Sequence, residues 1–462
     1  MNITEEIQQN TDLSLGRKIH IAWSLSLPTI IAQITNIAMQ YIDAAMVGRL
    51  GASASASVGL VSTTIWLFSG VTTAAIYGFA VQIAQAVGAG HDHRAASIFR
   101  QGMRSVLIFS LIMAGFAVAI ASLLPGWLGA EADIRSDATS YFLIIGLFLP
   151  ASQLRFYAGG CLQSTGDTKT PGILSVMLCL LNVILNALLI PGPSELTLAG
   201  HVISLPGAGL GVTGAALATG LSNLIIGLLL FYIAAFRNKY LKIVWKENVP
   251  FERDCLKNAL KISVPIALES GAISGAMVVT TRIVAPLGTI AIAANSFAIT
   301  AESFCYMPGY GLETSATTLV GQCIGAMHTK LARSFAWITT VMGMVIMAAT
   351  GLVMFFVCPA VFAFLTPDAA VRALGVKVLR IELLAEPFFG ASIVAAGAMR
   401  GAGDTLIPSI MNLISIWGVR VTLCALLVGT YGLTGAWIAM CAELCFRGII
   451  FLIRLYLSKA LS

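Results

Sequence analysis

The first half of this sequence reappears in its second half at a constant offset of 237 positions. Proline, glycine and short turn motifs recur in the same order and without a gap. The clearest pairs are Pro28 with Pro265, Gly88 with Gly325, and the Gly-Asp-Thr motifs that begin at Gly166 and Gly403. Ordered matches at one offset indicate that a single structural unit was duplicated, so the fold must consist of two related halves.

The composition places this duplicated unit in a membrane. Of the 462 residues, 58% are hydrophobic and only 10% are charged, and the mean hydropathy is +0.89. Soluble domains carry roughly 25% charged residues. Apolar stretches of about 20 residues or more recur along the chain, each long enough to cross a bilayer core of roughly 30 Å. They lack the alternating polarity of a transmembrane β-strand, which excludes a β-barrel.

These stretches predict an all-α polytopic membrane protein with twelve transmembrane helices, arranged as two parallel six-helix repeats that form two lobes. Gly, Pro and charged clusters separate the helices. The first repeat is predicted at 19–47, 54–87, 95–124, 134–160, 169–191 and 208–236. The second repeat is predicted at 257–285, 289–325, 330–358, 371–399, 405–429 and 433–457.

Charged segments predict the lobe boundaries and the orientation. Residues 1-236 are expected to form the N-terminal lobe, 237-256 a cytoplasmic linker, and 257-462 the C-terminal lobe. Lys and Arg gather at both chain ends, in the linker and in the loop near 88–104, whereas the loop near 125–133 almost lacks them. The positive-inside rule therefore predicts a multi-pass protein of the cell inner membrane with both termini in the cytoplasm.

Other classes of protein fit the residues poorly. The nine cysteines show no metal-ligand spacing and are expected to be buried, reduced thiols. All five histidines fall in loops or at span ends, and no Ser–Lys cluster lies at depth, so we expect neither an enzyme nor a cofactor or metal site. The net charge of +6 reflects basic loops and does not indicate nucleic-acid binding. We expect a monomer whose partners are the lipid bilayer and small organic molecules.

Helix 1 carries the most informative polar pattern. Gln33, Asn36, Gln40 and Asp43 are spaced by three, four and three residues, so they share one helix face. A polar stripe in a lipid-embedded helix must face a cavity or another helix, because an ionised side chain at mid-bilayer costs about 2.5–3.5 kcal/mol on insertion scales. We interpret the stripe as the wall of a water-filled cavity with Asp43 as its ion-binding group; the alternative is structural packing.

Helix 5 carries a second polar pair, Asn182 and Asn186, one helical turn apart. Their amides could share a proton or bind a small cation together with Asp43. The alternative is that they only bridge two helices by hydrogen bonds.

The second lobe is richer in acids than the first. Glu269, Glu302 and Glu386, with Tyr306, are predicted to line a substrate cavity together with Gln33. The alternative is pairing of the lobe's acids with arginines inside the spans, such as Arg282, Arg420 and Arg447. Further acids lie at Glu313, Glu382 and Glu443. The Asp or the Thr of each Gly-Asp-Thr motif is expected to cap the helix that follows; these residues are Asp167 and Thr168 before helix 5, and Asp404 and Thr405 before helix 11.

A parallel six-plus-six duplication with these landmarks resembles the multidrug and toxic-compound extrusion (MATE) family of cation-coupled antiporters. The resemblance covers almost the whole chain, and the segments 298–303 and 306–311 are similar to bacterial members nearer the DinF-like than the NorM-like branch. The matching segments are 43–51, 85–88, 160–167, 211–219, 265–269 and 397–404.

The resemblance implies a V-shaped pair of six-helix bundles that exports organic, often cationic, compounds against H⁺ or Na⁺ by alternating access. It implies that Asp43 is the coupling site, assisted by Asn182, Asn186 and Thr219. Asn36 and Gln40 are assigned to the same coupling site because they share the helix-1 face of Asp43. Acids on helices 7 and 10 of NorM-like members point to Glu269 and Glu386.

The family pattern has an aspartate where this chain has Asn186. A proton needs a single carboxylate, whereas Na⁺ is held better by more oxygen ligands and more negative charge, so H⁺ is favoured over Na⁺. The alternative is that acids of the second lobe hold Na⁺. The closest alternative is a flippase for lipid-linked oligosaccharides or precursors from the same wider superfamily. Such a flippase should have a basic cavity, and the intramembrane acids argue against it.

Overall fold

The computed structural model describes residues 3–9, 13–198, 201–205, 207–243 and 251–458. A short helix, α1 (Ile3–Gln9), precedes the first repeat. The first repeat forms what we call the first bundle, which ends in a π-helical turn, η1 (Ile233–Arg237). Its helices are α2 (Leu15–Gly48), α3 (Ala52–Gly88), α4 (Asp92–Ile120), α5 (Leu124–Trp127), α6 (Ala132–Leu147), α7 (Leu149–Ser164), α8 (Lys169–Leu189) and α9 (Gly211–Tyr232).

The second repeat forms the second bundle. Two of its helical units are interrupted, one by a 3-10 turn and one by a π-helical segment. Its elements are α10 (Arg253–Val284), η2 (Ala285–Leu287), α11 (Thr289–Gly325), α12 (Thr329–Leu365), α13 (Ala369–Glu382), η3 (Leu383–Ala385), α14 (Glu386–Gly401), α15 (Leu406–Leu413), η4 (Ile414–Val421), α16 (Thr422–Tyr431) and α17 (Leu433–Leu457).

Each of the twelve predicted spans corresponds to a helical unit, so the predicted all-α membrane fold is confirmed. Within the described residues, ten helices are long and apolar enough to cross a bilayer. The bent pair α6–α7, which turns by 43° at Phe148, makes an eleventh. The twelfth unit, α13–α14, does not meet the same test of length and hydropathy; Glu382 and Glu386 lie on either side of its 3-10 turn.

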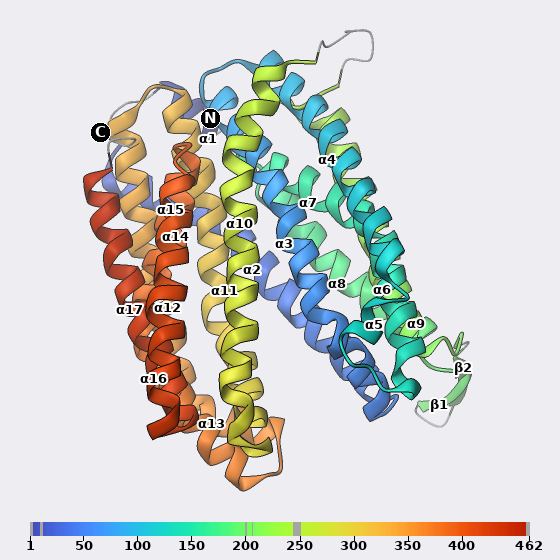
Figure 1. The fold of residues 1–462 in the computed structure, drawn as a ribbon. Helices are drawn as coiled ribbons and strands as arrows, with labels where there is room; N and C mark the ends of the chain where they lie inside the picture. The colour runs from blue at the N-terminus through green and yellow to red at the C-terminus, as the bar shows by residue number, and fades with distance from the viewer. Residues whose placement is uncertain (1–2, 10–12, 199–200, 206, 244–250, 459–462) are drawn as a thin grey trace.

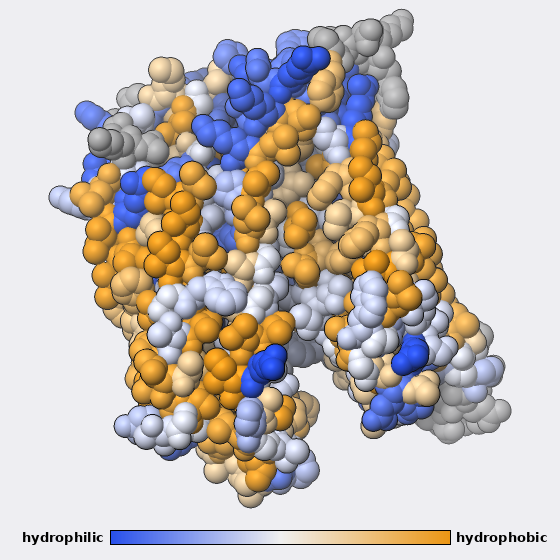
Figure 2. Space-filling view, in the orientation of Figure 1, coloured by the Kyte–Doolittle hydropathy of each residue, from blue (hydrophilic) through white to orange (hydrophobic). Residues whose placement is uncertain are grey.

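The two bundles meet at one end and diverge at the other (Figure 1). Both described chain ends lie where they meet, which we call the terminus side. Figure 2 shows a notch between the bundles on the opposite side, with apolar and polar residues interspersed on both legs beside it. The predicted cytoplasmic location of the terminus side stays a prediction, as do the three domain boundaries, and part of the predicted linker, 244–250, lies outside the described residues.

The loop predicted on the opposite side, 192–207, contains a short antiparallel hairpin. Strand β1 (Ser194–Leu198) pairs with β2 (His201–Leu205), with Ser194 opposite Leu205. Apolar patterning of the spans gave no signal for these strands, because the hairpin lies outside the duplicated unit. It extends from the far end of the first bundle (Figure 1).

Repeat-related residues build the contact between the bundles on the terminus side. A Cβ added at Gly88 would collide with the backbone of Gln322, and one at Gly325 would collide with the backbone of Gln85. The two glutamines reach across the same contact: Gln85 Nε2 donates to the Gly401 carbonyl at 3.1 Å, and Gln322 Nε2 donates to the Ser164 carbonyl at 2.9 Å. Every member of this set has its partner 237 positions away, so the contact has the twofold symmetry of the repeat.

Helix α1 closes over this contact from the terminus side. Gln8 Nε2 donates to the Val87 carbonyl of the first bundle at 2.7 Å, while His328 Nδ1 of the second bundle lies 3.0 Å from the Ile7 carbonyl. Glu6 holds Arg17 through two hydrogen bonds of 2.6 and 2.8 Å, and this guanidinium lowers the pKa of the Glu6 carboxyl. Helix α1 therefore touches both bundles where they are closed.

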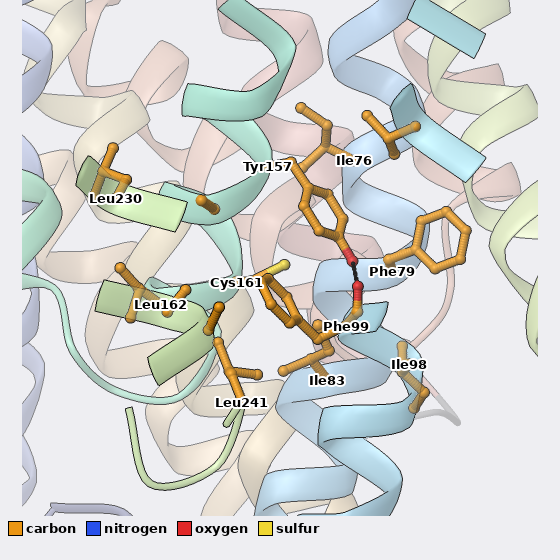
Figure 3. Packing of buried hydrophobic residues seen from close by; sticks show 14 of the residues in the cluster. Ile76, Phe79, Ile83, Ile98, Phe99, Tyr157, Cys161, Leu162, Leu230 and Leu241 are labelled. Atoms are coloured by element: carbon orange, nitrogen blue, oxygen red, sulfur yellow. Dashed lines mark hydrogen bonds between the residues drawn. The ribbon is translucent and has the colours of Figure 1, made fainter. Parts of the chain in front are cut away.

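The first bundle has its own apolar core near the terminus side (Figure 3). Tyr157 is fully buried, and its hydroxyl donates to the Phe99 carbonyl at 2.9 Å while the two rings stack 5.6 Å apart. Ile83 and Leu241 lie in the same cluster. This packing holds α3, α4, α7 and the segment after η1 together as one unit.

Enlarging the glycines of the inter-bundle contact should open the terminus side. In Gly88→Ala and Gly325→Ala, the new methyl group meets the opposite backbone, and such overpacking costs about 1–3 kcal/mol. This cost arises only in the conformation in which the two bundles touch on the terminus side. We therefore expect the conformational equilibrium to shift toward the state in which the bundles are separated there. Spin labels at His91→Cys and Thr329→Cys, in a background without the nine native cysteines, should report a longer distance.

Gly115→Ala is the matched control, because a Cβ at Gly115 meets nothing within 4 Å. Its label distance should equal that of the parent protein. An unchanged distance in both contact variants would contradict the role given to these glycines.

Candidate functional site

Asp43 lies in a cluster of four polar side chains from three helices of the first bundle. We call Asp43 (α2), Asn182 and Asn186 (α8) and Thr219 (α9) the Asp43 cluster. Asn186 Nδ2 donates to Asp43 Oδ1 at 2.5 Å, and Thr219 Oγ1 donates to Asp43 Oδ2 at 3.4 Å. The two asparagines are joined by a 3.1 Å bond from Asn186 Nδ2 to Asn182 Oδ1. The structure thus brings together the four residues that the sequence and the family resemblance selected.

Local helix geometry explains the cluster. Asn182 and Asn186 are four residues apart on α8 and therefore face the same way. Both are fully buried, so their amides can be stabilised only by other protein groups. Helix α9 approaches α8 closely because Gly214, which has no side chain, contacts the Leu189 backbone. Small residues at helix contacts allow this approach in a bilayer, where packing replaces the hydrophobic effect.

The cluster can hold Asp43 in either protonation state. The hydrogen bonds that its carboxylate accepts from Asn186 and Thr219 come from neutral donors, and an ionised Asp43 has no cationic partner among the described residues. Asn186 Oδ1 is buried and has no hydrogen-bond partner within the described part of the chain. An amide carries both a donor and an acceptor. Asn186 can therefore donate to an ionised Asp43 or accept from a protonated one.

The rest of the helix-1 stripe is divided. Gln33 and Asn36 line a cavity of about 190 Å³ between α2, α3, α7 and α11. Gln40 is exposed and makes no hydrogen bond within the described residues. Of the six residues predicted for ion coupling, four meet in the Asp43 cluster, Asn36 faces this cavity, and Gln40 lies apart from both.

The cavity beside Gln33 has one charged residue in its lining, Arg155. Arg155 Nε donates to Asn223 Oδ1 at 2.6 Å, and its guanidinium lies 3.9 Å from the centroid of the Phe156 ring. Sequence reasoning did not select Arg155. The signal available was an arginine within a predicted span, followed by an aromatic residue.

Glu269 is not free to line a cavity in this structure. Its carboxylate accepts hydrogen bonds from Arg400 at 3.2 Å, from Ser409 Oγ at 2.7 Å and from Asn412 Nδ2 at 2.6 Å. Arg400 also forms an ion pair with Glu313, and its guanidinium lies 5.8 Å from the ring of Tyr77 on α3 of the first bundle. The structure therefore places Glu269 in a buried ionic network at the bundle interface.

Arg400 was missed because the helix containing it was predicted to end at residue 399. The arginines named from the sequence have other roles: Arg420 and Arg447 both pair with the fully buried Glu443, at 2.7 and 3.1 Å. Arg282 is exposed and has no ion-pair partner among the described residues. The predicted pairing of acids with arginines inside the spans therefore holds for Arg420 and Arg447, and it does not hold for Arg282 among the described residues.

Three other acids form a separate group within the second bundle. Glu302, Glu382 and Glu386 lie close enough to repel one another electrostatically. Glu382 and Glu386 are fully buried, and neither carboxylate has a hydrogen-bond partner within the described residues. Tyr306 is half-buried beside them and packs on Phe389 at a centroid distance of 5.6 Å. The predicted substrate residues therefore fall in three places: Gln33 in the Arg155 cavity, Glu269 in the ionic network, and Glu302, Tyr306 and Glu386 here.

The MatE family model matches the chain twice, over residues 28–188 and 265–426. The chain belongs to the MatE family. The two matched segments begin 237 positions apart, which is the offset of the internal repeat. Members of this family are membrane transporters, so the prediction of a transporter rather than an enzyme is confirmed.

Individual relatives agree with the family assignment. A probable multidrug resistance protein NorM of Thermotoga maritima is 27% identical, over 92% of this chain and 89% of the relative. An outward-facing structure of a multidrug resistance MATE transporter has a TM-score of 0.87 at 20% identity, with 96% of each chain covered. A transporter of the MOP superfamily from Pyrococcus furiosus has a TM-score of 0.88 at 19% identity, covering 99% of this chain and 98% of that chain. At these identities, the structures show the fold alone, and the DinF-like branch stays a prediction.

Removing the cation of the buried network should destabilise the protein strongly. In Arg400→Met, the carboxylates of Glu269 and Glu313 remain buried without their cation, and such a loss costs about 3–5 kcal/mol. Thermal unfolding of the purified transporter should show a clearly lower Tm, with a smaller fall for Arg400→Lys, which keeps the charge. Arg282→Met, which removes an exposed and unpaired arginine, should leave the Tm unchanged. Equal Tm values for Arg400→Met and Arg282→Met would contradict the network's structural role.

Proposed function

We propose that this chain is a multidrug efflux transporter that exports small organic compounds by antiport, with Asp43 as the coupling group. The observation that carries the proposal is the Asp43 cluster: one carboxylate held by two buried asparagines and a threonine, with no cation beside it among the described residues. Similarity to NorM multidrug resistance proteins and to MATE transporters of the same fold supports the substrate class. A carboxylate with no fixed cationic partner can bind a proton or another cation and release it again during the transport cycle.

We favour H⁺ over Na⁺ as the coupling ion. The cluster supplies one negative charge, because the position one turn after Asn182 is Asn186 rather than an aspartate. One carboxylate is sufficient for a proton, while bare Na⁺ binds better with several oxygen ligands and more negative charge. Among the described residues, no group of three or more His, Cys, Asp or Glu side chains is placed to hold a metal ion.

The proposed cycle follows from the shape of the molecule. With the termini in the cytoplasm, the notch of Figure 2 faces the outside, so a proton reaches Asp43 from outside. Protonation removes the charge that the amide of Asn186 and the hydroxyl of Thr219 stabilise, and charge-assisted hydrogen bonds are about twice as strong as neutral ones. Helix α2 then repacks and the bundles rock against each other. This movement closes the binding sites to one side of the membrane and opens them to the other, so that proton and substrate are carried in opposite directions.

Electrostatics supports two substrate classes. The group of Glu302, Glu386 and Tyr306 favours organic cations, which is the class we propose. Arg155, the charged residue in the lining of the smaller cavity, favours a substrate with an anionic group and keeps the flippase as a second candidate. In the transporter from Pyrococcus furiosus, a binding pocket of reverse polarity suggests a different function for that protein. Uptake of a cationic and an anionic dye into the same proteoliposomes separates the two candidates.

Asp43→Asn should abolish coupled transport, because the amide retains the shape of the side chain but cannot take up a proton. In proteoliposomes, a pH gradient should drive accumulation of a fluorescent cation by the parent protein and not by the variant. Asp137→Asn is the control, since Asp137 is exposed on α6 and lies outside the cluster. Gradient-driven accumulation by Asp43→Asn at the parent rate would overturn the coupling proposal.

Asn186→Asp should change the ion that supports transport. The substitution places a second carboxylate 2.5 Å from Asp43 Oδ1, where Asn186 now donates its hydrogen bond. Two carboxylates at this distance repel each other, and a cation between them relieves the repulsion. We expect transport by the variant to become dependent on a Na⁺ gradient, measured with the pH held equal across the membrane. No response to Na⁺ would show that the charge of the cluster does not select the ion.

A further inference from the structure

A cavity separate from the Asp43 cluster lies at the terminus-side end of the first bundle. It has a volume of about 630 Å³ and opens between α2, the α7–α8 junction and η1. Its lining combines basic and polar residues with the apolar side chains of Ile3, Leu25 and Ile233. The charged residues of its lining are Asp167, Lys169, Arg237 and Lys239, and Thr168 lies beside them.

Positive charge at this cavity exceeds the negative charge that compensates it. Lys169 and Arg237 are exposed, and neither has an ion-pair partner among the described residues. Lys239 pairs with Glu5 at 3.3 Å, and both groups are open to solvent. The carboxylate in the lining, Asp167, accepts the backbone N–H of Thr170 and caps α8, as the sequence predicted. Three cations therefore face two carboxylates, and the excess positive charge lies on the exposed Lys169 and Arg237.

A buried hydroxyl in the cavity wall also lacks a partner. The Thr168 side chain is 1% exposed, and its Oγ1 makes no hydrogen bond within the described part of the chain. Leaving a buried hydroxyl unsatisfied costs about 1–3 kcal/mol. Because this oxygen is enclosed by protein atoms, a ligand in the cavity does not reach it, and the basic side chains carry the site.

The surface next to the cavity faces lipid. Trp23 on α2, Ile173 on α8 and Tyr232 on α9 are 44%, 64% and 48% exposed, and each lies within about one helical turn of a cavity residue. Trp and Tyr are enriched where a membrane protein crosses the bilayer interface. The cavity therefore lies at headgroup level, with apolar surface beneath it for acyl chains.

The second bundle lacks this combination although it repeats the same motif. The residue that corresponds to Lys169 is Leu406, and Asp404 pairs with Arg454 at 2.7 Å instead of standing beside free cations. The same helix junction occurs in both bundles, but the basic residues occur only at the first. The fold of the junction therefore does not require them.

We propose that this cavity binds the headgroup of an anionic phospholipid, with Lys169 and Arg237 holding the phosphate. Basic pockets between transmembrane helices on the cytoplasmic side are suited to such headgroups. The adjoining lipid-facing aromatic and apolar side chains favour a lipid over a soluble phosphate compound. The site is independent of the Asp43 cluster and of the direction of transport.

Binding of phosphatidylglycerol tests the proposal. Purified transporter in nanodiscs is titrated with phosphatidylglycerol against a phosphatidylcholine background, and bound lipid is counted by native mass spectrometry. Each basic residue near an anionic headgroup contributes about fivefold in affinity, so Lys169→Ala with Arg237→Ala should weaken binding about 25-fold.

Lys330→Ala with Arg253→Ala is the control, because both residues are exposed on the terminus side outside the cavity. It should bind phosphatidylglycerol as the parent does, and the Tm of every variant is measured to exclude misfolding. Equal weakening in the control pair, or parental binding in the cavity pair, would overturn the site. Displacement of the lipid by glycerol phosphate at similar concentration would show that the cavity takes soluble phosphate and would overturn the lipid assignment.

Discussion

The contact between the two bundles on the terminus side is the constraint on which the rest of the structure depends. Two glycines without side chains let α3 and α11 touch backbone to backbone, and two glutamine amides cross the same contact. In lipid, helices associate by close packing and hydrogen bonds, because lipid is as apolar as the side chains. Buried apolar side chains of α2, such as Ile21 and Leu25, also pack with Leu319 of α11 across the bundle interface, so close packing, amide hydrogen bonds and apolar contacts together hold it closed.

Charge is distributed around this symmetric contact unequally. Glu269 has Arg400 as a fixed cation. Protonating Glu269 would remove a negative charge that compensates the buried guanidinium, and breaking such a pair costs about 3–5 kcal/mol. Asp43 has only neutral partners among the described residues, so its protonation leaves no unpaired cation behind. The first bundle can therefore change its charge at low cost, whereas the charge of the Glu269–Arg400 network is held constant. This difference is the physical reason to place coupling at Asp43.

The sequence predicted the symmetric part of the molecule better than the asymmetric part. The offset of 237 and the apolar stretches predicted the two bundles and their twelve helical units, because glycine, proline and hydropathy act locally. Helical spacing also predicted that Asn182 and Asn186 share a face. It could not predict that Glu269 meets Arg400, since that pair joins α10 to α14 and depends on how the helices pack. Thr219 came only from the family resemblance, and the hairpin at 194–205 had no counterpart in the repeat.

Helix α2 joins the proposed coupling site to the bundle interface. Tyr41, two residues before Asp43, donates or accepts a 2.7 Å hydrogen bond with Ser303 Oγ of the second bundle and lies 2.9 Å from the Thr300 carbonyl. Nearer the start of α2, Thr29 Oγ1 donates to the Gly311 carbonyl of the second bundle at 2.8 Å. A helix is stiff over this length, so α2 cannot repack at Asp43 without disturbing both inter-bundle contacts. Protonation of one carboxylate inside the first bundle thereby acts on the fit between the bundles, which is where alternating access has to be controlled.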